Sequence, residues 1–384
     1  MNLKISNNIV YQNDLDIDSF SSMLDDPTQC YKFYWLDAIL TLVKRGNKEI
    51  KFDDIVNEMI VGAWYSVSKY HLKLGPTVLG KCENYLEHAI HILLDSCDIN
   101  EKMNLENIRI IVEKSDEILK VDKINIIKNV PYRLLAPFLK KYIKEKDFNG
   151  GKKALIDKIN SINNKVLLPY TITYDNGYNK KIILNEEWIR FINDNFDILK
   201  NWIQLKKIFF LQKRNPGVPG IIYKLGDESE KRRLGKARDL WKLYSEIKKE
   251  PLMDIYTEDY LIDNQFDLDH FIPWTYIAND ELWNLTPMTK SLNCSKSNNL
   301  PDWDTYFFRM AKNQFSLYEL IFNNEIMHKK FELCKNDNLN SIWAQETLFI
   351  PGYKKDEFIH VLEKNMKPIY NNAYSIGFRV WKVK

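Results

Sequence analysis

The chain has 384 residues, with 55 Lys and Arg against 52 Asp and Glu and a formal net charge of +3. A hydrophobic fraction of 45% excludes a disordered chain, and the length predicts two or three domains of roughly 150 residues each. Five scattered cysteines without a CxxC pair exclude a disulfide framework and a cysteine-held zinc knuckle. The sequence has no signal-peptide pattern and no apolar run of about 18 residues, so we expect a cytoplasmic protein with no membrane partner.

The first 165 residues have the apolar spacing of helices. Helices are predicted over 29–45, 52–68, 78–95, 104–120, 133–145 and 153–162. Asp53 stands where it can cap the second of them. The segment 1–165 is therefore predicted to be a helical domain with a recognition, regulatory or partner-binding role.

The period changes after residue 165. Two β-type runs, 167–174 and 180–184, flank Asp175-Asn176-Gly177 and predict a hairpin. A helix is predicted over 186–212, ending at the RNPGVPG loop, and a long basic helix over 229–249. The basic residues that we predict to contact nucleic acid in this region, 166–250, are Lys213, Arg214, Arg232, Arg233, Lys236 and Arg238. The alternative is an ordinary solvated helix surface.

The stretch FDLDHFIPWTYIANDELWNLTPMTKSLNCSKSNNLP contains most of the candidate chemistry. Its candidate site residues are Asp269, His270, Asn284, Asn293 and Lys296. One carboxylate and one amide oxygen form the kind of oxygen-only site that Mg²⁺ prefers. A neutral histidine beside such an ion can deprotonate water, an asparagine carbonyl can fix its tautomer, and a lysine can offset phosphate charge. The combination predicts phosphodiester hydrolysis.

The pattern DH-x13-N-x8-N-x2-K resembles the HNH, or ββα-metal, endonucleases. It is most similar to the zinc-free HNH domain of the RNA-guided CRISPR effector nucleases, and to standalone bacterial HNH proteins bearing DHFIPW, WNL and NxSKSxxLP. The YKFYW and QKRNPGVPGI segments extend the resemblance to such standalone proteins more loosely. The resemblance implies that Asp269 and Asn293 bind one Mg²⁺ or Mn²⁺ ion, that His270 is the general base, that Asn284 orients His270, and that Lys296 lies near the scissile phosphate.

The sequence departs from the family name at its third letter, where Asn293 replaces a histidine. That variant favours Mg²⁺ or Mn²⁺ over a zinc-type ligand set. Many relatives also carry two CxxC zinc pairs around the motif. This chain has none, so we expect no structural zinc.

We therefore predict a mostly α-helical α+β protein, with a ββα-metal module at 251–302 and a helical region at 303–384. The expected function is metal-dependent endonucleolytic cleavage, of double-stranded DNA rather than RNA, in bacterial restriction or anti-phage defence. Cutting both strands with one metal site predicts a homodimer or sequential nicking. The alternatives are an RNase or non-specific nuclease toxin, an effector inactive until a defence partner or signal activates it, and a non-enzymatic nucleic-acid binding protein.

Weaker signals have ordinary explanations. His88 and His91 share a helical face beside Glu87, but the spacing is not that of a zinc protease, and a partly buried helix is the preferred interpretation. The YKFYW aromatics suit buried packing better than base stacking.

The near-neutral net charge of the whole chain hides two segments of opposite charge. Residues 201–250 hold 13 basic and 6 acidic side chains (+7), and residues 251–300 hold 2 basic and 8 acidic side chains (−6). Attraction to phosphate depends on this local arrangement.

Overall fold

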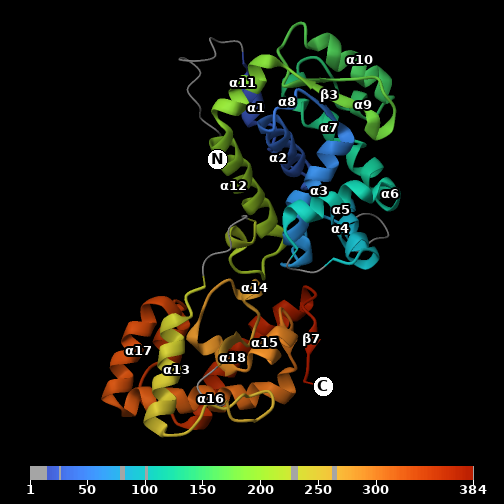
Figure 1. Cartoon of the computed structure of the whole chain (residues 1–384). Helices are drawn as coiled ribbons and strands as arrows, with labels where there is room; N and C mark the ends of the chain where they lie inside the picture. Colours follow the sequence, from blue (N-terminus) through green and yellow to red (C-terminus); the bar gives the residue numbers. More distant parts are fainter. Residues whose placement is uncertain are drawn as a thin grey trace. The chain divides into compact units, whose positions relative to one another are not determined.

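A computed structural model of the chain describes residues 15–25, 27–77, 83–99, 103–225, 232–261 and 266–383. The chain divides into two units, 1–216 and 217–384, which are described separately below (Figure 1). Helices dominate both units and the sheets are small, so the predicted mostly helical α+β class is confirmed. The division at 165, 250 and 302 stays a prediction. None of the described helices combines the length and the apolar composition needed to cross a membrane.

The first unit is built around two long helices, α2 (Tyr31–Lys44) and α3 (Phe52–Ser68), which pack on each other and match the prediction. The other helices are α1 (Ile17–Ser21), α4 (Tyr85–Ser96), α5 (Leu105–Lys114), α6 (Asp116–Ile127), α7 (Val130–Arg133), α8 (Ala136–Leu139), α9 (Glu145–Phe148), α10 (Lys152–Ile162), α11 (Glu186–Asp194) and α12 (Phe196–Arg214). The capping role predicted for Asp53 is wrong. Lys51 occupies the N-cap, and the Asp53 carboxylate pairs with the buried Lys123 ammonium at 2.7 Å.

Three predicted helices of this unit are broken where local chemistry interrupts the backbone ladder. The 104–120 helix divides at Ser115, whose hydroxyl donates to the Ile111 carbonyl, and the 186–212 helix divides at Asn195, whose amide donates to the Phe191 carbonyl. The 133–145 helix is replaced by short pieces that begin near Pro131 and Pro137. The predicted 78–95 helix corresponds to α4, which runs from 85 to 96, and residues 78–82 lie outside the described residues.

The predicted hairpin is confirmed as β2 (Tyr170–Ile172) and β3 (Lys181–Leu184), with Tyr170 opposite Leu184. The sequence reasoning missed a third strand, β1 (Glu49–Lys51), which pairs antiparallel with β3 to give the order β1-β3-β2. Its three residues are too few to show a period of two, and only their pairing with β3 identifies them as a strand.

The described part of the second unit contains two sheets of two strands each, among helices: an antiparallel pair at 267–270 and 285–288, and a parallel pair at 300–301 and 380–381. Its elements are η2 (Ile221–Lys224), α13 (Gly235–Lys248), β4 (Asp267–His270), α14 (Trp274–Ile277), η4 (Leu282–Asn284), β5 (Leu285–Met288), α15 (Lys290–Lys296), β6 (Leu300–Pro301), α16 (Trp303–Asn323), α17 (Glu325–Asn338), η5 (Ala344–Leu348), α18 (Lys355–Ser375) and β7 (Val380–Trp381). The predicted basic helix is shorter than expected. It begins at Gly235, residues 232–234 are not helical, and 226–231 lie outside the described part of the chain.

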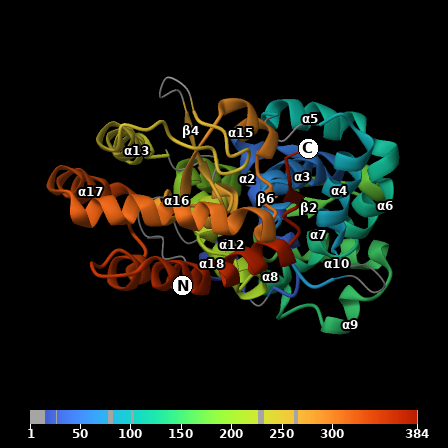
Figure 2. The ribbon, with the colours of Figure 1, turned by 90° about the horizontal axis from the view of Figure 1, so that it is seen from below.

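Helix α16 supports the antiparallel sheet of β4 and β5. It lies beside α17 and α18, and α13 packs on α17 (Figure 2). The buried Gln314 of α16 donates its amide to the carbonyls of Leu282, at 3.1 Å, and Leu285, at 2.6 Å, where η4 passes into β5. Because these carbonyls are buried at the start of β5, Gln314 fixes the strand that pairs with β4.

The loop after Pro216 is tied to α14. Lys224 is buried, and its ammonium donates to the carbonyls of Tyr276, at 2.6 Å, and Pro219. Gly220 has a φ of +60°, and a Cβ there would lie 3.1 Å from Tyr223 Cδ2 and 3.3 Å from Ala278 Cβ. Both features hold the loop close to the segment that follows β4.

We expect Gln314→Leu to lower the free energy of unfolding of the second unit by about 1–3 kcal/mol, because two buried carbonyls lose their donor. Hydrogen exchange of peptides from 282–288, followed through urea unfolding, measures this. Glu319→Leu, at an exposed position of the same helix, is the control and should change the value by less than about 0.5 kcal/mol. Equal protection in both variants would contradict the prediction.

Burial lowers the pKa of Lys224 to about 7, from 10.5 for a solvated lysine. Between these two values the unfolded chain binds more protons than the folded chain, so the free energy of unfolding should rise with pH across this window. Lys224→Met removes the titrating group and should flatten the rise. Urea unfolding of the wild type, Lys224→Met and the exposed control Lys248→Met at about pH 7 and about pH 9 tests it. An unchanged slope in Lys224→Met would refute the assignment.

Candidate active site

The candidate site is built on the antiparallel pair β4 and β5, in which Asp269 lies opposite Thr286 and His270 opposite Leu285. The pairing continues past the end of β4. Phe271 N–H donates to the Asn284 carbonyl at 2.8 Å, and the Asn284 side chain both accepts from Ile272 N–H and donates to the Ile272 carbonyl, each at 2.8 Å. Asn284 is fully buried. Asn284 therefore holds the backbone just after His270. The sequence prediction instead expects the side-chain carbonyl of Asn284 to contact the His270 imidazole.

Asp269 is a buried carboxylate with both oxygens engaged. Tyr256 donates its hydroxyl to Oδ2 at 2.8 Å, and the Lys296 ammonium donates to Oδ1 at 3.0 Å. Lys296 also donates to the His270 carbonyl at 2.8 Å. Burial lowers the pKa of Lys296, and the Asp269 charge opposes that shift. The fully buried ammonium thus connects α15 to the end of β4.

His270 is also buried, and its Nε2 lies 2.8 Å from Asp280 Oδ1. Burial lowers the pKa of the imidazole, although the Asp280 hydrogen bond partly opposes this. The pKa of Asp280 is itself lowered: burial opposes ionisation, but the bonds from His270 and from the Arg233 N–H outweigh it. An ionised carboxylate only accepts hydrogen bonds, so we assign the proton of a neutral imidazole to Nε2. Nδ1 is then the basic nitrogen.

Asn293 lies on α15, close to β4. Its amide nitrogen donates to Asp267 Oδ2 at 3.4 Å, and Asp267 precedes Asp269 by two residues, on the same face of the strand. The helix is positioned by Asp254, whose Oδ2 accepts from the N–H of Thr289, the N-cap residue. The structure thus brings Asn293 next to Asp267, a carboxylate that the sequence reasoning did not name.

The donor chemistry fits a hard divalent cation. Asp267 and Asp269 supply carboxylate oxygens from one strand face, and an Asn293 amide whose nitrogen faces Asp267 keeps its oxygen for a ligand. The Lys296 ammonium is the group that a cation at Asp269 would have to compete with. In the described ranges no three His, Cys, Asp or Glu side chains gather in a way that could hold a metal. The donor set at this site is of another kind, because one of its members is the Asn293 amide.

Four of the predicted nucleic-acid contacts lie around this site. The Arg232 guanidinium is 5.4 Å from the Trp274 ring centroid, and Arg238 donates to the Phe266 carbonyl at 3.0 Å. Two further pairs join Arg233 to Asp337 at 3.7 Å and Lys236 to Asp337 at 2.9 Å. Internal carboxylates and carbonyls thus already engage three of these four basic side chains.

The other two predicted contacts belong to the first unit, at the end of α12. Lys213 is exposed, whereas the Arg214 guanidinium lies 3.6 Å from the Phe210 ring centroid and donates to the Phe210 carbonyl. A nucleic-acid role for all six basic residues stays a prediction.

The weaker candidates of the first unit have internal partners. His88 Nδ1 is 2.8 Å from Asp122 Oδ2, and His91 pairs separately with Glu83. Glu87 accepts from the Leu74 N–H at 2.7 Å. In the YKFYW segment the side chains of Phe33, Tyr34 and Trp35 are buried, as the packing interpretation expects.

Sequence reasoning missed four site residues, Asp254, Tyr256, Asp267 and Asp280. Asp267 lies within the motif, two residues before Asp269 on the same strand. Asp254 and Tyr256 stand before the motif in an irregular segment, DIY, where no period marks a functional position. Asp280 lies inside the connection between the strands, and only the folding of that connection brings it to His270. The acidic composition of 251–300 was the one feature of the sequence that indicated further carboxylates at the site.

The comparisons with known proteins agree with this location. A family model described as HNH endonuclease matches residues 254–302. No curated protein and no solved structure matches the chain. The narrower likeness to CRISPR effector nucleases stays a prediction. The matched span begins at Asp254, includes β4, β5 and α15, and contains every residue of the predicted site motif. Residues 254–302 of this chain are therefore an HNH endonuclease domain.

Proposed function

We propose that the protein is a divalent-metal-dependent endonuclease that cleaves double-stranded DNA. The HNH endonuclease family of its 254–302 domain supports a nuclease of the hydrolase class. The observation that carries the proposal is the His270 imidazole, held by Asp280 at 2.8 Å at the end of the strand that bears Asp269. A neutral, oriented base beside a carboxylate is the pair that hydrolysis of a phosphodiester needs.

In this proposal His270 accepts the proton of the attacking water at Nδ1. Asp280 holds Nε2–H and so keeps the tautomer, and it stabilises the imidazolium that forms. Asn284 fixes the backbone after His270 through Ile272. General-base catalysis of this kind contributes roughly 10²–10⁴ in rate.

Asp269 and Asn293 would hold the divalent ion, Mg²⁺ or Mn²⁺, with Asp267 beside them. When bound, the ion supplies electrostatic stabilisation of the phosphate and the leaving oxygen. Lys296 is fully buried and contacts Asp269 and the His270 carbonyl, so its role here is to hold the carboxylate and the end of β4 in register.

The choice of DNA rests on the basic segment that precedes the domain. Residues 201–250 carry a net +7, and the Arg232 guanidinium lies at the site, 5.4 Å from the Trp274 ring centroid. The role in bacterial restriction or anti-phage defence rests on the resemblance stated above. An RNase is the second candidate, because the base and the proposed metal ligands do not distinguish the two sugars.

We expect His270→Ala to lower the rate of plasmid cleavage by about 10²–10⁴-fold, because the attacking water loses its base. Conversion of supercoiled DNA to nicked and linear forms measures the rate. His360→Ala, at an exposed histidine of α18, is the matched control and should cleave like the wild type. A His270→Ala protein that is folded by circular dichroism and cleaves at the wild-type rate would exclude the proposed mechanism.

Removal of divalent ions with EDTA should abolish cleavage, and Mg²⁺ or Mn²⁺ should restore it. Asn293→Ala should raise the Mg²⁺ concentration needed for half-maximal rate, because one proposed ligand is lost, whereas Asn365→Ala on α18 should not. Duplex DNA and RNA of one sequence are digested side by side. Full activity in EDTA would rule out the metal, and cleavage of RNA alone would move the proposal to the RNase.

A further inference from the structure

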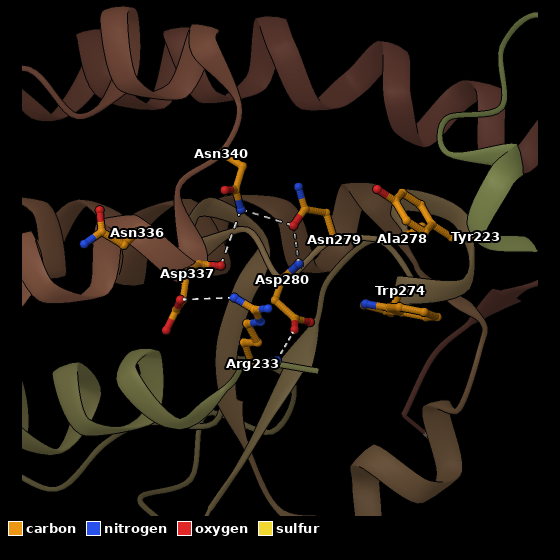
Figure 3. A pocket seen from close by; sticks show the side chains of 9 residues that line it. All are labelled: Tyr223, Arg233, Trp274, Ala278, Asn279, Asp280, Asn336, Asp337 and Asn340. Atoms are coloured by element: carbon orange, nitrogen blue, oxygen red, sulfur yellow. Dashed lines mark hydrogen bonds and ion pairs between the residues drawn. The ribbon is translucent and has the colours of Figure 1, made fainter. Parts of the chain in front are cut away.

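A pocket of about 320 Å³ opens beside the proposed base (Figure 3). It lies wholly in the second unit, and its lining includes Tyr223, Trp274, Asn279, Asp280, Asn336 and Asn340. Asp280 is shared between the pocket and the candidate site, because its Oδ1 contacts His270 Nε2. A molecule in the pocket would therefore lie one side chain away from the imidazole. The volume is at the small end for ligand sites, which suits one nucleotide unit rather than a duplex.

One side of the pocket is aromatic. Figure 3 shows the rings of Tyr223 and Trp274 near each other, at the opposite end from Asn336 and Asp337. Tyr223 is 44% exposed and Trp274 only 5%. The loop that carries Tyr223 is fixed by Lys224, through the Tyr276 carbonyl, and by the close approach at Gly220. An accessible ring on a fixed loop is a stacking surface that does not need to be ordered on binding.

The other side carries amides and a carboxylate. Asn336 and Asn340 are exposed at and beyond the end of α17, and the Asn340 amide donates to Asn279 Oδ1 at 3.3 Å. Asp337 is paired with Lys236. Carboxylates in the lining, Asp280 and Asp337, disfavour a phosphate inside the pocket. Amide and carboxylate groups opposite an aromatic ring instead match the polar edge and the flat face of a nucleobase.

We propose that this pocket binds the base of one unpaired nucleotide next to the phosphodiester that is cleaved. The inference rests on the proposed nuclease function and adds to it that the substrate presents an unstacked base at the cut. Tyr223 supplies the stacking surface, and the exposed amides of Asn336 and Asn340 bind the base edge. Asn279 holds Asn340 in place, because its Oδ1 accepts from the Asn340 amide while its own amide donates to Glu281. The Arg232 guanidinium, 5.4 Å from the Trp274 ring centroid, leaves positive charge at the site for the backbone.

The test is a series of fluorescently labelled single-stranded DNA oligonucleotides, each with one base removed to leave an abasic position. Binding to the full chain is measured by anisotropy in EDTA, so that no cleavage occurs. The wild type should lose roughly 5- to 100-fold in affinity when one particular base is missing, the range expected for one stacked base. Tyr223→Ala should bind the intact strand with the same loss and then be indifferent to that abasic position.

Two further variants complete the design. Tyr374→Ala, at a 60% exposed tyrosine of α18 outside the pocket, is the matched control and should keep the wild-type profile. Asn336→Ala changes only an exposed amide and provides the test if Tyr223→Ala fails to fold. It should reduce the sensitivity of binding to the abasic position. Circular dichroism of each variant reports folding.

The outcomes separate the two proposals. A flat wild-type profile, or a folded Tyr223→Ala that still responds to the missing base, overturns the base pocket. Plasmid cleavage by the wild type is measured in parallel. If the wild type cleaves DNA but its binding profile is flat, only the base-pocket proposal is refuted. If the wild type cleaves no nucleic acid with any metal, the proposed nuclease function, on which the pocket proposal rests, is refuted.

Discussion

The geometry of the nuclease domain depends on one buried amide. A two-stranded ladder of four residues on each strand has little stability by itself, and here it is prolonged by the Asn284 side chain, which replaces a missing strand neighbour for Ile272. Leaving those two backbone groups unpaired in the interior would cost about 1–3 kcal/mol each. The same amide fixes where the chain turns after His270, and so fixes the direction of the imidazole.

The strand then presents the side chains of Asp269 and His270 to different environments. Alternation along β4 sends Asp269 toward Tyr256 and Lys296, while His270 contacts Asp280. Each buried ionisable group has a partner of complementary character, as groups removed from water require. The acid–lysine pair holds the elements together, whereas the histidine–aspartate pair leaves one ring nitrogen available for chemistry.

Basic residues around the domain are largely paired with nearby acids, and the net charge of +3 conceals a basic segment at 201–250 that precedes an acidic one at 251–300. Lys236 and Arg233 pair with Asp337, and Arg238 lies 3.8 Å from Asp267. Arg232 contacts an aromatic ring and remains a cation for a ligand. Positive potential at the domain therefore depends on a few side chains rather than on the total.

The sequence by itself determined the helices with a long apolar period, the hairpin and the nuclease motif, because these signals are local: the spacing of α3 and the DH, N, N and K positions can be read along one segment. It could not determine β1, the break at Asn195, or the roles of Tyr256 and Asp280. Strand β1, Tyr256 and Asp280 depend on partners that lie far from them along the chain. The break at Asn195 depends on the donation of its side-chain amide to the Phe191 carbonyl. The task of Asn284, too, was decided only when the connection between the strands folded back on Ile272, because a side chain's partner is set by the tertiary path and not by its spacing.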